Sequence, residues 1–340
     1  MRHALLLLAL LSACGKAATA PDAGPPPQHP HDDVLTLFHA QLKATHNSYH
    51  LKGDTDLVAW SYSHAPLDVQ AEKQGVRGFE LDLHYKPDTD TLEVFHVESL
   101  DEKTTCRKFV DCLGKLKAWS DAHPLHLPLV IHLEPKSDLT DAQQDPFIAR
   151  TEKDILSVWG EGRLITPAMV QGDAATLGEA VSKRGWPTLA ATRGKVLFAW
   201  DDSKATRSHY THGGKDLLGR LIFVDSAPGE PLAAYAILND VVGEANQKKI
   251  AAALAANMLV RVFADNEMVE PTKNDRSVLE AALASGAQII STDVPAKVDG
   301  LEYFVEIPGG TPARCDPVTA KGDLPCSSEA LEDPKLLQPR

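Results

Sequence analysis

Apolar residues gather along this chain in short runs, and the segments between the runs carry apolar residues every three or four positions. From about residue 35 onward this alternation of strand, loop and helix continues without a second linker or an internal repeat. Several runs are apolar almost throughout, which is typical of parallel strands buried on both faces. The predicted strands are 40–45, 76–83, 128–134, 194–200, 220–225, 258–263 and 286–292.

The segments between these strands have the periodicity of amphipathic helices, as Phe109, Leu113 and Leu116 illustrate. The predicted helices are 66–74, 107–121, 143–158, 172–184, 246–256 and 274–285. Alternating βα units with right-handed crossovers form either an open doubly wound sheet or a closed (β/α)8 barrel. Segment 92–96 supplies an eighth candidate strand, and this count favours an α/β fold of the TIM-barrel type, (β/α)8 but distorted.

The N-terminus carries the pattern of a lipoprotein signal. Arg2 precedes the run "ALLLLALL", which is too short to cross a membrane but fits the core of a signal peptide. The run ends in "LSAC", which resembles the bacterial lipobox, so we expect Cys14 to be lipidated and to anchor the protein to a membrane. The alternative is an ordinary signal peptide cut near "AATA", with Cys14 discarded. Gly15 follows the cysteine, which favours the outer membrane, and the expected location is the bacterial cell envelope, as an outer-membrane lipoprotein or a secreted protein.

Changes in composition divide the chain into four expected segments. Residues 1–14 form the signal peptide and lipobox, and the small, Pro-rich residues 15–34 form a tether. Residues 35–302 form the barrel, and residues 303–340 form a C-terminal extension that we expect a disulfide to pin.

Four cysteines remain when Cys14 is set aside, and four cysteines allow three pairings. Short spacings favour the pairs Cys106–Cys112 and Cys315–Cys326, each closing a small loop in an oxidising compartment. A zinc site is the weaker alternative, because neither pair has CxxC spacing and no histidine lies beside them.

The formal net charge of −13 argues against a nucleic-acid partner, because no basic stripe is available to neutralise phosphates. The acidic residues are scattered rather than clustered, which is typical of a solubilising surface. We expect the protein to be a monomer.

Unusual polar residues fall at the ends of the predicted strands, where barrel enzymes place their catalytic groups. His46 and Asn47 follow the first strand, and His96 and Glu134 end two others. Glu80 and Asp82 stand two positions apart on one strand, so their side chains share a face.

This carboxylate pair allows two interpretations. "VRGFELDLHY" also fits a surface strand with a polar outer face and an apolar inner face. If Glu80 and Asp82 point into the barrel mouth instead, their repulsion and lost hydration require a compensating cation. Together with Glu134 and Asn47 they would form a set of hard oxygen ligands suited to Ca²⁺.

Two histidines beside such a cation suggest acid–base chemistry. One neutral and one protonated imidazole can deprotonate a nucleophile and protonate a leaving group. For a phosphodiester, the cation would polarise a phosphoryl oxygen. We interpret His84 and His132 as structural residues, Ser48 and Tyr49 as loop support, and His50 as a bystander.

An ordered series of sequence blocks carries a resemblance to a known family. The blocks are "ATHNSY", "GVRGFELDLHY", "FHV", "HPLHLPLVIHLEPK", "RGKVLFAWDD", "LVRVFAD" and "SGAQIISTD". In this order they resemble the Ca²⁺-dependent bacterial phosphatidylinositol-specific phospholipases C, within the superfamily of phospholipase C-like phosphodiesterases, over roughly residues 36–300. The resemblance implies a distorted TIM barrel that acts on a phospholipid at a membrane surface. It also implies that phosphatidylinositol is cleaved to diacylglycerol and inositol 1,2-cyclic phosphate.

The resemblance also implies roles for individual residues. His46 would be the general base and His96 the general acid that protonates the leaving oxygen. Lys136 and Arg261 would bind the phosphate, and Asp293 would orient His46. The matching Ca²⁺ ligands are Asn47, Glu80, Asp82 and Glu134.

Two positions depart from the family pattern. Val97 stands where a glycine commonly follows the second histidine, and Val294 and Pro295 stand where an aromatic residue would pack on the inositol ring. These departures bear on substrate preference.

Two other functions remain as alternatives. A glycerophosphodiester phosphodiesterase shares the barrel, the Glu-x-Asp pair and two histidines, but typically has arginine where this chain has Asn47. A non-catalytic envelope lipoprotein that binds inositol phosphates or sugars would be expected to lack one of the six core residues, and all six are present.

Overall fold

A ring of parallel strands forms the inner wall of the protein in the computed structural model, which describes residues 29–202 and 204–336. Hydrogen-bonded neighbours follow the order β6-β4-β2-β1-β10-β9-β8, and β7 pairs with β6. A parallel bridge between Asp225 and Tyr235 joins β7 to β8 and closes the ring. In the described part of the chain its eight strands are β1 (Ala40–Thr45), β2 (Gly78–Lys86), β4 (Leu129–Pro135), β6 (Val196–Trp200), β7 (Phe223–Val224), β8 (Tyr235–Ile237), β9 (Leu259–Phe263) and β10 (Ile289–Thr292). The fold is therefore the predicted (β/α)8 barrel.

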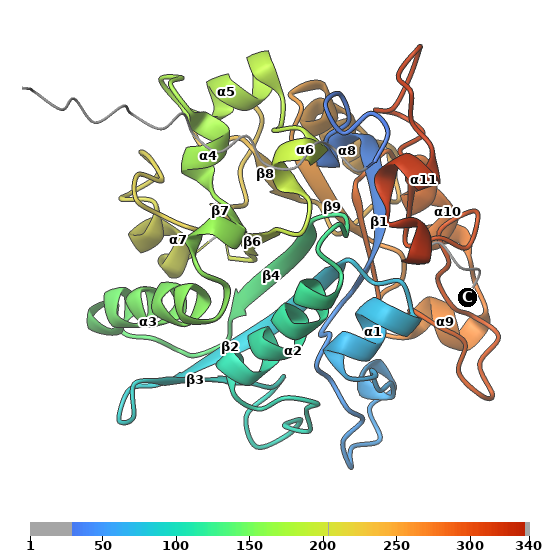
Figure 1. Cartoon of the computed structure of the whole chain (residues 1–340). Helices are drawn as coiled ribbons and strands as arrows, with labels where there is room; N and C mark the ends of the chain where they lie inside the picture. Colours follow the sequence, from blue (N-terminus) through green and yellow to red (C-terminus); the bar gives the residue numbers. More distant parts are fainter. Residues whose placement is uncertain (1–28, 203, 337–340) are drawn as a thin grey trace, which may run out of the picture.

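Helices surround these strands (Figure 1), and large buried side chains fill the layer between strands and helices, as Trp200 on β6 shows by its ring contacts with Phe147 and Tyr210. The predicted apolar face of 107–121 is correct, since Phe109, Leu113 and Leu116 are buried. The helices are α1 (Leu67–Lys73), α2 (Phe109–Ala122), α3 (Asp141–Trp159), α4 (Pro167–Gln171), α5 (Leu177–Arg184), α6 (Leu189–Thr192), α7 (Ala205–Tyr210), α8 (Glu244–Ala255), α9 (Val269–Lys273), α10 (Ser277–Ala284) and α11 (Ser328–Leu331). Short 3-10 helices span Leu37–His39, Val58–Trp60, Glu161–Arg163 and Pro334–Leu336.

The barrel is distorted at two seams, which are places where neighbouring strands share only one pair of residues. Strands β1 and β2 share a single register pair, Ala44 with Gly78, whereas β2 and β4 pair from Gly78 to Leu83. A Cβ atom on Gly78 would lie 2.5 Å from the Cβ of Ala44, so only glycine allows the two strands to approach this closely. The second seam is the single bridge between β7 and β8.

The prediction that 92–96 is the eighth barrel strand is wrong. Strand β3 (Thr91–Val94) runs antiparallel to β2 and forms a hairpin outside the ring. Only residues 87–90 separate the two strands, and a parallel connection needs a dozen or more residues. The eighth barrel strand is β8, which the sequence did not reveal because it is three residues long and lies among alanines.

The predicted helix 172–184 begins later than expected. Gly172 has a φ of +51° and ends α4, and Thr176 then caps α5 by accepting a hydrogen bond from the backbone N–H of Glu179. The remaining short strands are β5 (Leu164–Ile165), parallel to β6, and β11 (Ala313–Cys315), antiparallel to β1.

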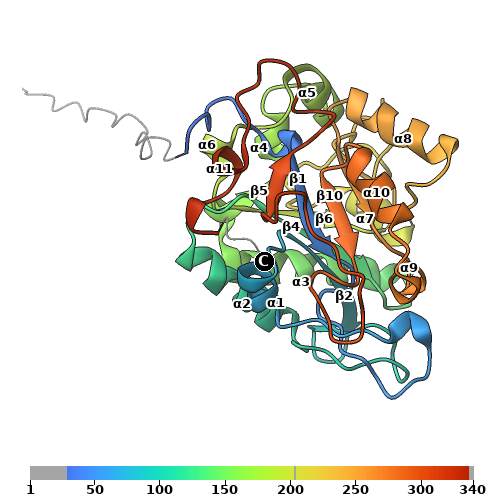
Figure 2. The same ribbon diagram turned by 90° about the vertical axis from the view of Figure 1, so that its right-hand side faces the viewer.

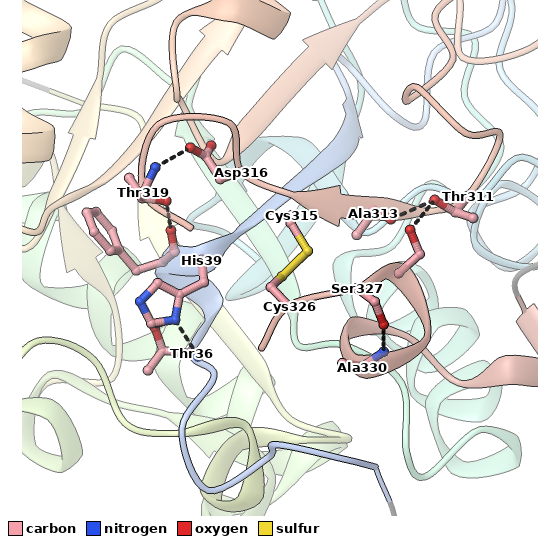
Figure 3. Close-up of a disulfide and its surroundings, with 12 residues drawn as sticks. Thr36, His39, Thr311, Ala313, Cys315, Asp316, Thr319, Cys326, Ser327 and Ala330 are labelled. Carbon is pink, nitrogen blue, oxygen red and sulfur yellow. Dashed lines mark hydrogen bonds between the residues drawn. A yellow bond between two sulfur atoms is a disulfide. The ribbon is translucent and has the colours of Figure 1, made fainter. Parts of the chain in front are cut away.

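The C-terminal segment covers the end of the barrel at which the strands begin. Strand β11 pairs with the first residues of β1, and α11 lies at this end of the molecule, opposite α9 (Figure 2). Glu332, after α11, forms a buried ion pair with Arg77 and accepts a hydrogen bond from the backbone N–H of Leu127, just before β2 and β4. The predicted disulfide Cys315–Cys326 ties β11 to the segment that leads into α11 (Figure 3).

The second predicted disulfide, Cys106–Cys112, is also present, and it joins the loop before α2 to the first turn of that helix. Among the described residues no helix is both long and apolar enough to span a bilayer. Cys14, the signal peptide and most of the predicted tether lie outside the described residues.

Candidate active site

His46 and Asp293 face each other across two neighbouring strands. In the parallel pairing of β1 with β10, Thr45 lies opposite Thr292, so the next residue of each strand meets at the C-terminal end of the barrel. Asp293 Oδ1 lies 2.8 Å from His46 Nδ1 and accepts a hydrogen bond from it. This bond fixes the imidazole with its Nε2 turned toward Glu80, whose nearest oxygen lies 4.0 Å away. The predicted pairing of Asp293 with His46 is therefore present.

Three predicted metal ligands converge on one point. Asp82 on β2 lies directly opposite Glu134 on β4, and Glu80 shares the face of Asp82. One oxygen of each of the three carboxylates lies within 4.8 Å of the others. Like charges directly opposite each other in a sheet repel, so this register requires a counter-charge.

Asp82 has little compensation beyond the Lys136 ammonium, which lies 3.3 Å from its Oδ2. Its side chain is fully buried, and neither of its oxygens forms a hydrogen bond with any residue in 29–202 or 204–336. Burial raises the pKa of Asp82 well above its ordinary value, and the neighbouring Glu134 and Glu80 raise it further, against the opposing effect of Lys136. A buried carboxylate without hydrogen bonds, within a set made only of oxygen donors, fits a hard divalent cation such as Ca²⁺.

The two predicted phosphate-binding residues are engaged with these carboxylates. The Lys136 ammonium lies 2.7 Å from Glu134 Oε1 and 3.3 Å from Asp82 Oδ2. Arg261 is completely buried on β9, donates to Glu80 and lies 2.7 Å from Asp201. Arg261 thus holds Glu80 from beneath the site, while the partly exposed Lys136 lies at its mouth.

Asn47 connects the base to the carboxylates. Its φ of +43° lies in the left-handed region, which asparagine tolerates better than most residues. Its Nδ2 lies 3.3 Å from His46 Nε2 and donates to the Tyr62 hydroxyl at 3.3 Å. Its Oδ1 accepts a hydrogen bond of 3.1 Å from Tyr49. Burial raises the pKa of Tyr49 well above its ordinary value, and the negative charge of Asp82 raises it further.

The electrostatic environment of His46 favours its protonated form. Burial alone lowers the pKa of His46, but the negative charges of Asp293 and Glu80 outweigh burial and raise the pKa to about 9. A cation bound at Glu80 would oppose this effect, so the acidity of His46 depends on how the carboxylates are compensated.

His96 lies on the loop between β3 and α2, two residues beyond the hairpin strand. Its Nδ1 lies 2.9 Å from Asp101 Oδ2, and 16% of its side chain is exposed. His96 and Lys136 both line a cavity of about 560 Å³ that also contains His84 and Ser137. His96 therefore reaches the same mouth as the carboxylates, although it does not follow a barrel strand as predicted.

Sequence reasoning missed Asp101 and gave His50 no role. Asp101 accepts hydrogen bonds from both His96 and His50, the latter at 2.8 Å. Asp101 stands in the acidic stretch "ESLDEK", which carries no signal of burial, and only the fold reveals that its side chain is enclosed. His84 and His132 are buried and hydrogen-bonded: His84 Nε2 lies 3.0 Å from the carbonyl of Phe95, and His132 Nε2 lies 2.6 Å from the Tyr235 hydroxyl.

Comparison with protein families gives one match. The model of the family described as phosphoinositide phospholipase C, Ca²⁺-dependent, matches residues 86–317, which is more than half of the 340 residues. The match begins at the end of β2, so His46, Asn47, Glu80 and Asp82 precede it. No curated protein sequence matches the chain.

Solved structures with the same fold include two calcium-dependent enzymes. A calcium-dependent phosphoinositol-specific phospholipase C from the Gram-negative bacterium Pseudomonas sp, in an apo form, is 18% identical with a TM-score of 0.60, over 84% of this chain and 97% of that chain. A Ca²⁺-dependent phosphatidylinositol-specific phospholipase C from Streptomyces antibioticus is 18% identical with a TM-score of 0.55, over 76% of this chain and 95% of that chain. At this identity the two likenesses establish the fold.

Proposed function

The chain belongs to the Ca²⁺-dependent phosphoinositide phospholipase C family and is thus a phosphodiesterase of the phospholipase C type; from this premise we propose that it cleaves phosphatidylinositol to diacylglycerol and inositol 1,2-cyclic phosphate. The observation that carries the proposal is the pairing of each histidine with its own carboxylate, His46 with Asp293 and His96 with Asp101. His46 lies 4.0 Å from Glu80 of the carboxylate cluster, and His96 lines a cavity together with Lys136, which contacts Asp82 and Glu134. This arrangement is what metal-assisted acid–base chemistry requires.

His46 acts as the base. Because its Nδ1 is held by Asp293, its Nε2 takes the proton from the inositol 2-hydroxyl as that oxygen attacks phosphorus. Asp293 stabilises the imidazolium that forms, and Asn47 lies against the same Nε2.

His96 acts as the acid. Its Nδ1–H is likewise donated to a carboxylate, which stabilises the imidazolium, and the imidazolium carries a second proton on Nε2. As the bond from phosphorus to the diacylglycerol oxygen breaks, that oxygen receives the proton from His96. One P–O bond forms and one breaks, so the products are the cyclic phosphodiester and the neutral alcohol.

Glu80, Asp82 and Glu134 are the carboxylates that would hold Ca²⁺. The amide oxygen of Asn47, the fourth predicted ligand, accepts a hydrogen bond from Tyr49 in this structure. When bound, Ca²⁺ would polarise a phosphoryl oxygen and increase the acidity of the attacking hydroxyl. It would also offset the negative charge of Glu80, and this would lower the pKa of His46. Arg261 keeps Glu80 in place, and we assign Lys136 to the phosphate once Asp82 and Glu134 have another counter-ion.

The alternative of a glycerophosphodiester phosphodiesterase is less well supported by the first loop. The residue after His46 is Asn47, whose compact amide fits between His46, Tyr62 and Tyr49. A non-catalytic binding protein would have no need for two separate histidine–carboxylate pairs at one mouth.

The test is phosphorus NMR of the products formed from phosphatidylinositol with Ca²⁺ and with EGTA. We expect inositol 1,2-cyclic phosphate with Ca²⁺ and no turnover with EGTA. His46→Ala and His96→Ala should each lower kcat by roughly 10²–10⁴-fold. The control is His209→Ala, since His209 forms its hydrogen bonds with Asp141 and Asp145 on α3.

Glycerol 3-phosphate as the product would identify the alternative enzyme. Activity that persists in EGTA, or in both histidine variants, would contradict the mechanism.

A further inference from the structure

Two histidines share one buried carboxylate beside the proposed general acid. Asp101 Oδ2 lies 2.9 Å from His96 Nδ1 and 2.8 Å from His50 Nε2. The side chains of Asp101 and His50 are completely buried, whereas His96 is partly exposed to the mouth. We infer that Asp101 and His50 are positioning residues that hold His96 as the proton donor to the leaving group, an inference that rests on the proposed function.

The hydrogen bonds define which nitrogen carries each proton. A carboxylate can only accept, so His96 donates from Nδ1 and His50 donates from Nε2. The Nε2 of His96 is then the nitrogen that is left to face the substrate. The Nδ1 of His50 is buried and has no hydrogen-bond partner among the described residues, which agrees with a neutral ring whose proton is on Nε2.

The loop that carries His96 folds back to place Asp101. Reciprocal backbone hydrogen bonds of 3.0 and 2.8 Å join Val97 and Asp101, and Ser99 between them has a φ of +66°. The carboxylate thereby returns to the imidazole five residues before it in the chain. If this loop changed its conformation, Asp101 would no longer reach His96, even though both residues were still present.

His50 comes from the loop that carries the proposed base. Backbone hydrogen bonds from Leu51 to Lys103 and from Thr105 to Tyr49 pair the His50 segment with the segment after Asp101. The ring of His50 packs against Tyr62 with centroids 4.5 Å apart, and its edge meets His96 at 6.0 Å. The heptapeptide "ATHNSYH" thus supplies the base and also supports the acid.

Little space is left around the carboxylate. A Cβ atom on Gly53 would lie 3.1 Å from the other oxygen of Asp101. Trp60 stands edge-on to His96 with centroids 5.1 Å apart and limits its rotation. The group formed by His50, Asp101 and His96 is therefore enclosed by the protein and is open to the mouth only at His96.

A positioning role predicts a dependence on the leaving group. An alkoxide such as that of diacylglycerol needs a proton as it departs, whereas a nitrophenolate leaves without one. In Asp101→Asn the neutral amide no longer stabilises the imidazolium of His96. If its NH2 turns toward Nδ1, the ring is neutral with its one proton on Nε2, and a neutral imidazole is too weak an acid to protonate the leaving oxygen. The variant should therefore fail on the lipid and retain activity on an activated ester.

The experiment compares kcat on short-chain phosphatidylinositol and on a nitrophenyl inositol phosphodiester, both with saturating Ca²⁺. We expect Asp101→Asn to lose roughly 10²–10³-fold on the lipid and less than about threefold on the activated ester. His50→Leu should lose roughly threefold to tenfold on the lipid only, and His50→Gln less, because glutamine retains an N–H donor. Asp141→Asn is the control, because it removes a histidine–carboxylate hydrogen bond of 2.9 Å, with His209 on α7, that involves neither His96 nor Asp101.

His96→Ala distinguishes a failure of the acid role of His96 from a failure of the positioning role of Asp101 and His50. If His96→Ala loses equally on both substrates, the proposed acid role of His96 fails. If His96→Ala is selective for the lipid but Asp101→Asn and His50→Leu affect both substrates equally, or neither, the positioning role is overturned.

Gly53→Ala provides a second route if Asp101→Asn does not fold. The added methyl group crowds Asp101 without removing any hydrogen-bonding group. A loss confined to the lipid substrate supports the inference, and an unchanged ratio of the two rates contradicts it.

Discussion

At the scale of single residues, the site is built from charges that oppose one another. Asp82 and Glu134 are forced together by the register of β2 and β4, and Lys136 from the same strand end neutralises them incompletely. Arg261 likewise donates a hydrogen bond to Glu80 and partly neutralises its charge. Removing a buried charge that lacks a full set of partners can stabilise a protein, because the charge pays a desolvation cost.

We therefore expect Asp82→Asn to raise the free energy of unfolding of the Ca²⁺-free protein by about 1–2 kcal/mol while abolishing activity. The raised pKa of Asp82 means that the folded protein prefers the protonated form. Protonation of Asp82 stabilises the wild-type protein at pH values below the ordinary pKa of 3.8, and this contribution is lost as the pH rises through the raised pKa of the folded state. The difference in the free energy of unfolding between Asp82→Asn and the wild type should thus be larger at pH 7 than at pH 4. Urea unfolding at the two pH values in EGTA measures it.

Added Ca²⁺ should reverse this order of stability. The wild-type Tm should rise with Ca²⁺, and the Tm of Asp82→Asn should rise far less, because a ligand stabilises only the state that binds it. Asp240→Asn, at an exposed position, is the control and should behave as wild type. An Asp82→Asn protein that gains as much from Ca²⁺ as the wild type would remove Asp82 from the ligand set.

At the scale of secondary-structure elements, the β1–β2 seam controls the distance between the base and the carboxylates. His46 follows β1, and Glu80 lies on β2, but the strands share one register pair at Ala44 and Gly78. The close approach is extended by hydrogen bonds from the backbone N–H of Ser48 to the Glu80 carbonyl and from Glu80 N–H to the Ser48 hydroxyl. A displacement of either strand would therefore alter the catalytic geometry directly.

Gly78→Ala should destabilise the protein by about 1–3 kcal/mol, because the new methyl group meets the Cβ of Ala44 at 2.5 Å. It should also lower kcat by separating His46 from Glu80. Gly114→Ala is the matched control: Gly114 lies within α2 with no atom within 4 Å of a new Cβ, so alanine should stabilise by about 0.5–1 kcal/mol. Urea unfolding of both variants tests the seam, and equal effects of the two substitutions would contradict it.

The sequence predicted the positions of strands and helices more accurately than the pairing between strands. The two-residue spacing of Glu80 and Asp82 correctly placed both on one face, because side-chain direction in a strand is a local property. The pairing of β2 with the hairpin strand β3, and of β7 with β8, depends on which segments meet in space. The same limit hid Asp101, since its burial arises from the loop between Val97 and Asp101 and from the arrival of His50 from another loop.

At the scale of the whole molecule, the two ends of the barrel differ. The end where strands begin is sealed by β11, α11 and the buried pair of Arg77 with Glu332. The end where strands finish carries the site, and several loops there present exposed apolar side chains. These side chains are Leu57, Val58, Leu100, Val242 and Val298, each at least half exposed. A water-soluble substrate would not require this rim, whereas a lipid at a bilayer surface would.

We expect the triple substitution Leu57→Ser, Val58→Ser and Leu100→Ser to weaken binding to phosphatidylinositol vesicles by roughly 10-fold or more, since each side chain loses its apolar burial. Turnover of vesicles should fall in parallel, while turnover of the monomeric short-chain lipid should change less than about twofold, because none of the three residues is in the catalytic or metal-binding sets. Sedimentation of the protein with vesicles gives the binding, and the ratio of the two rates gives the effect on catalysis. Leu218→Ser is the matched control: this leucine is 69% exposed but lies before β7, toward the sealed end. If Leu218→Ser reduces vesicle binding as much as the triple substitution does, the mouth is not the membrane-facing surface.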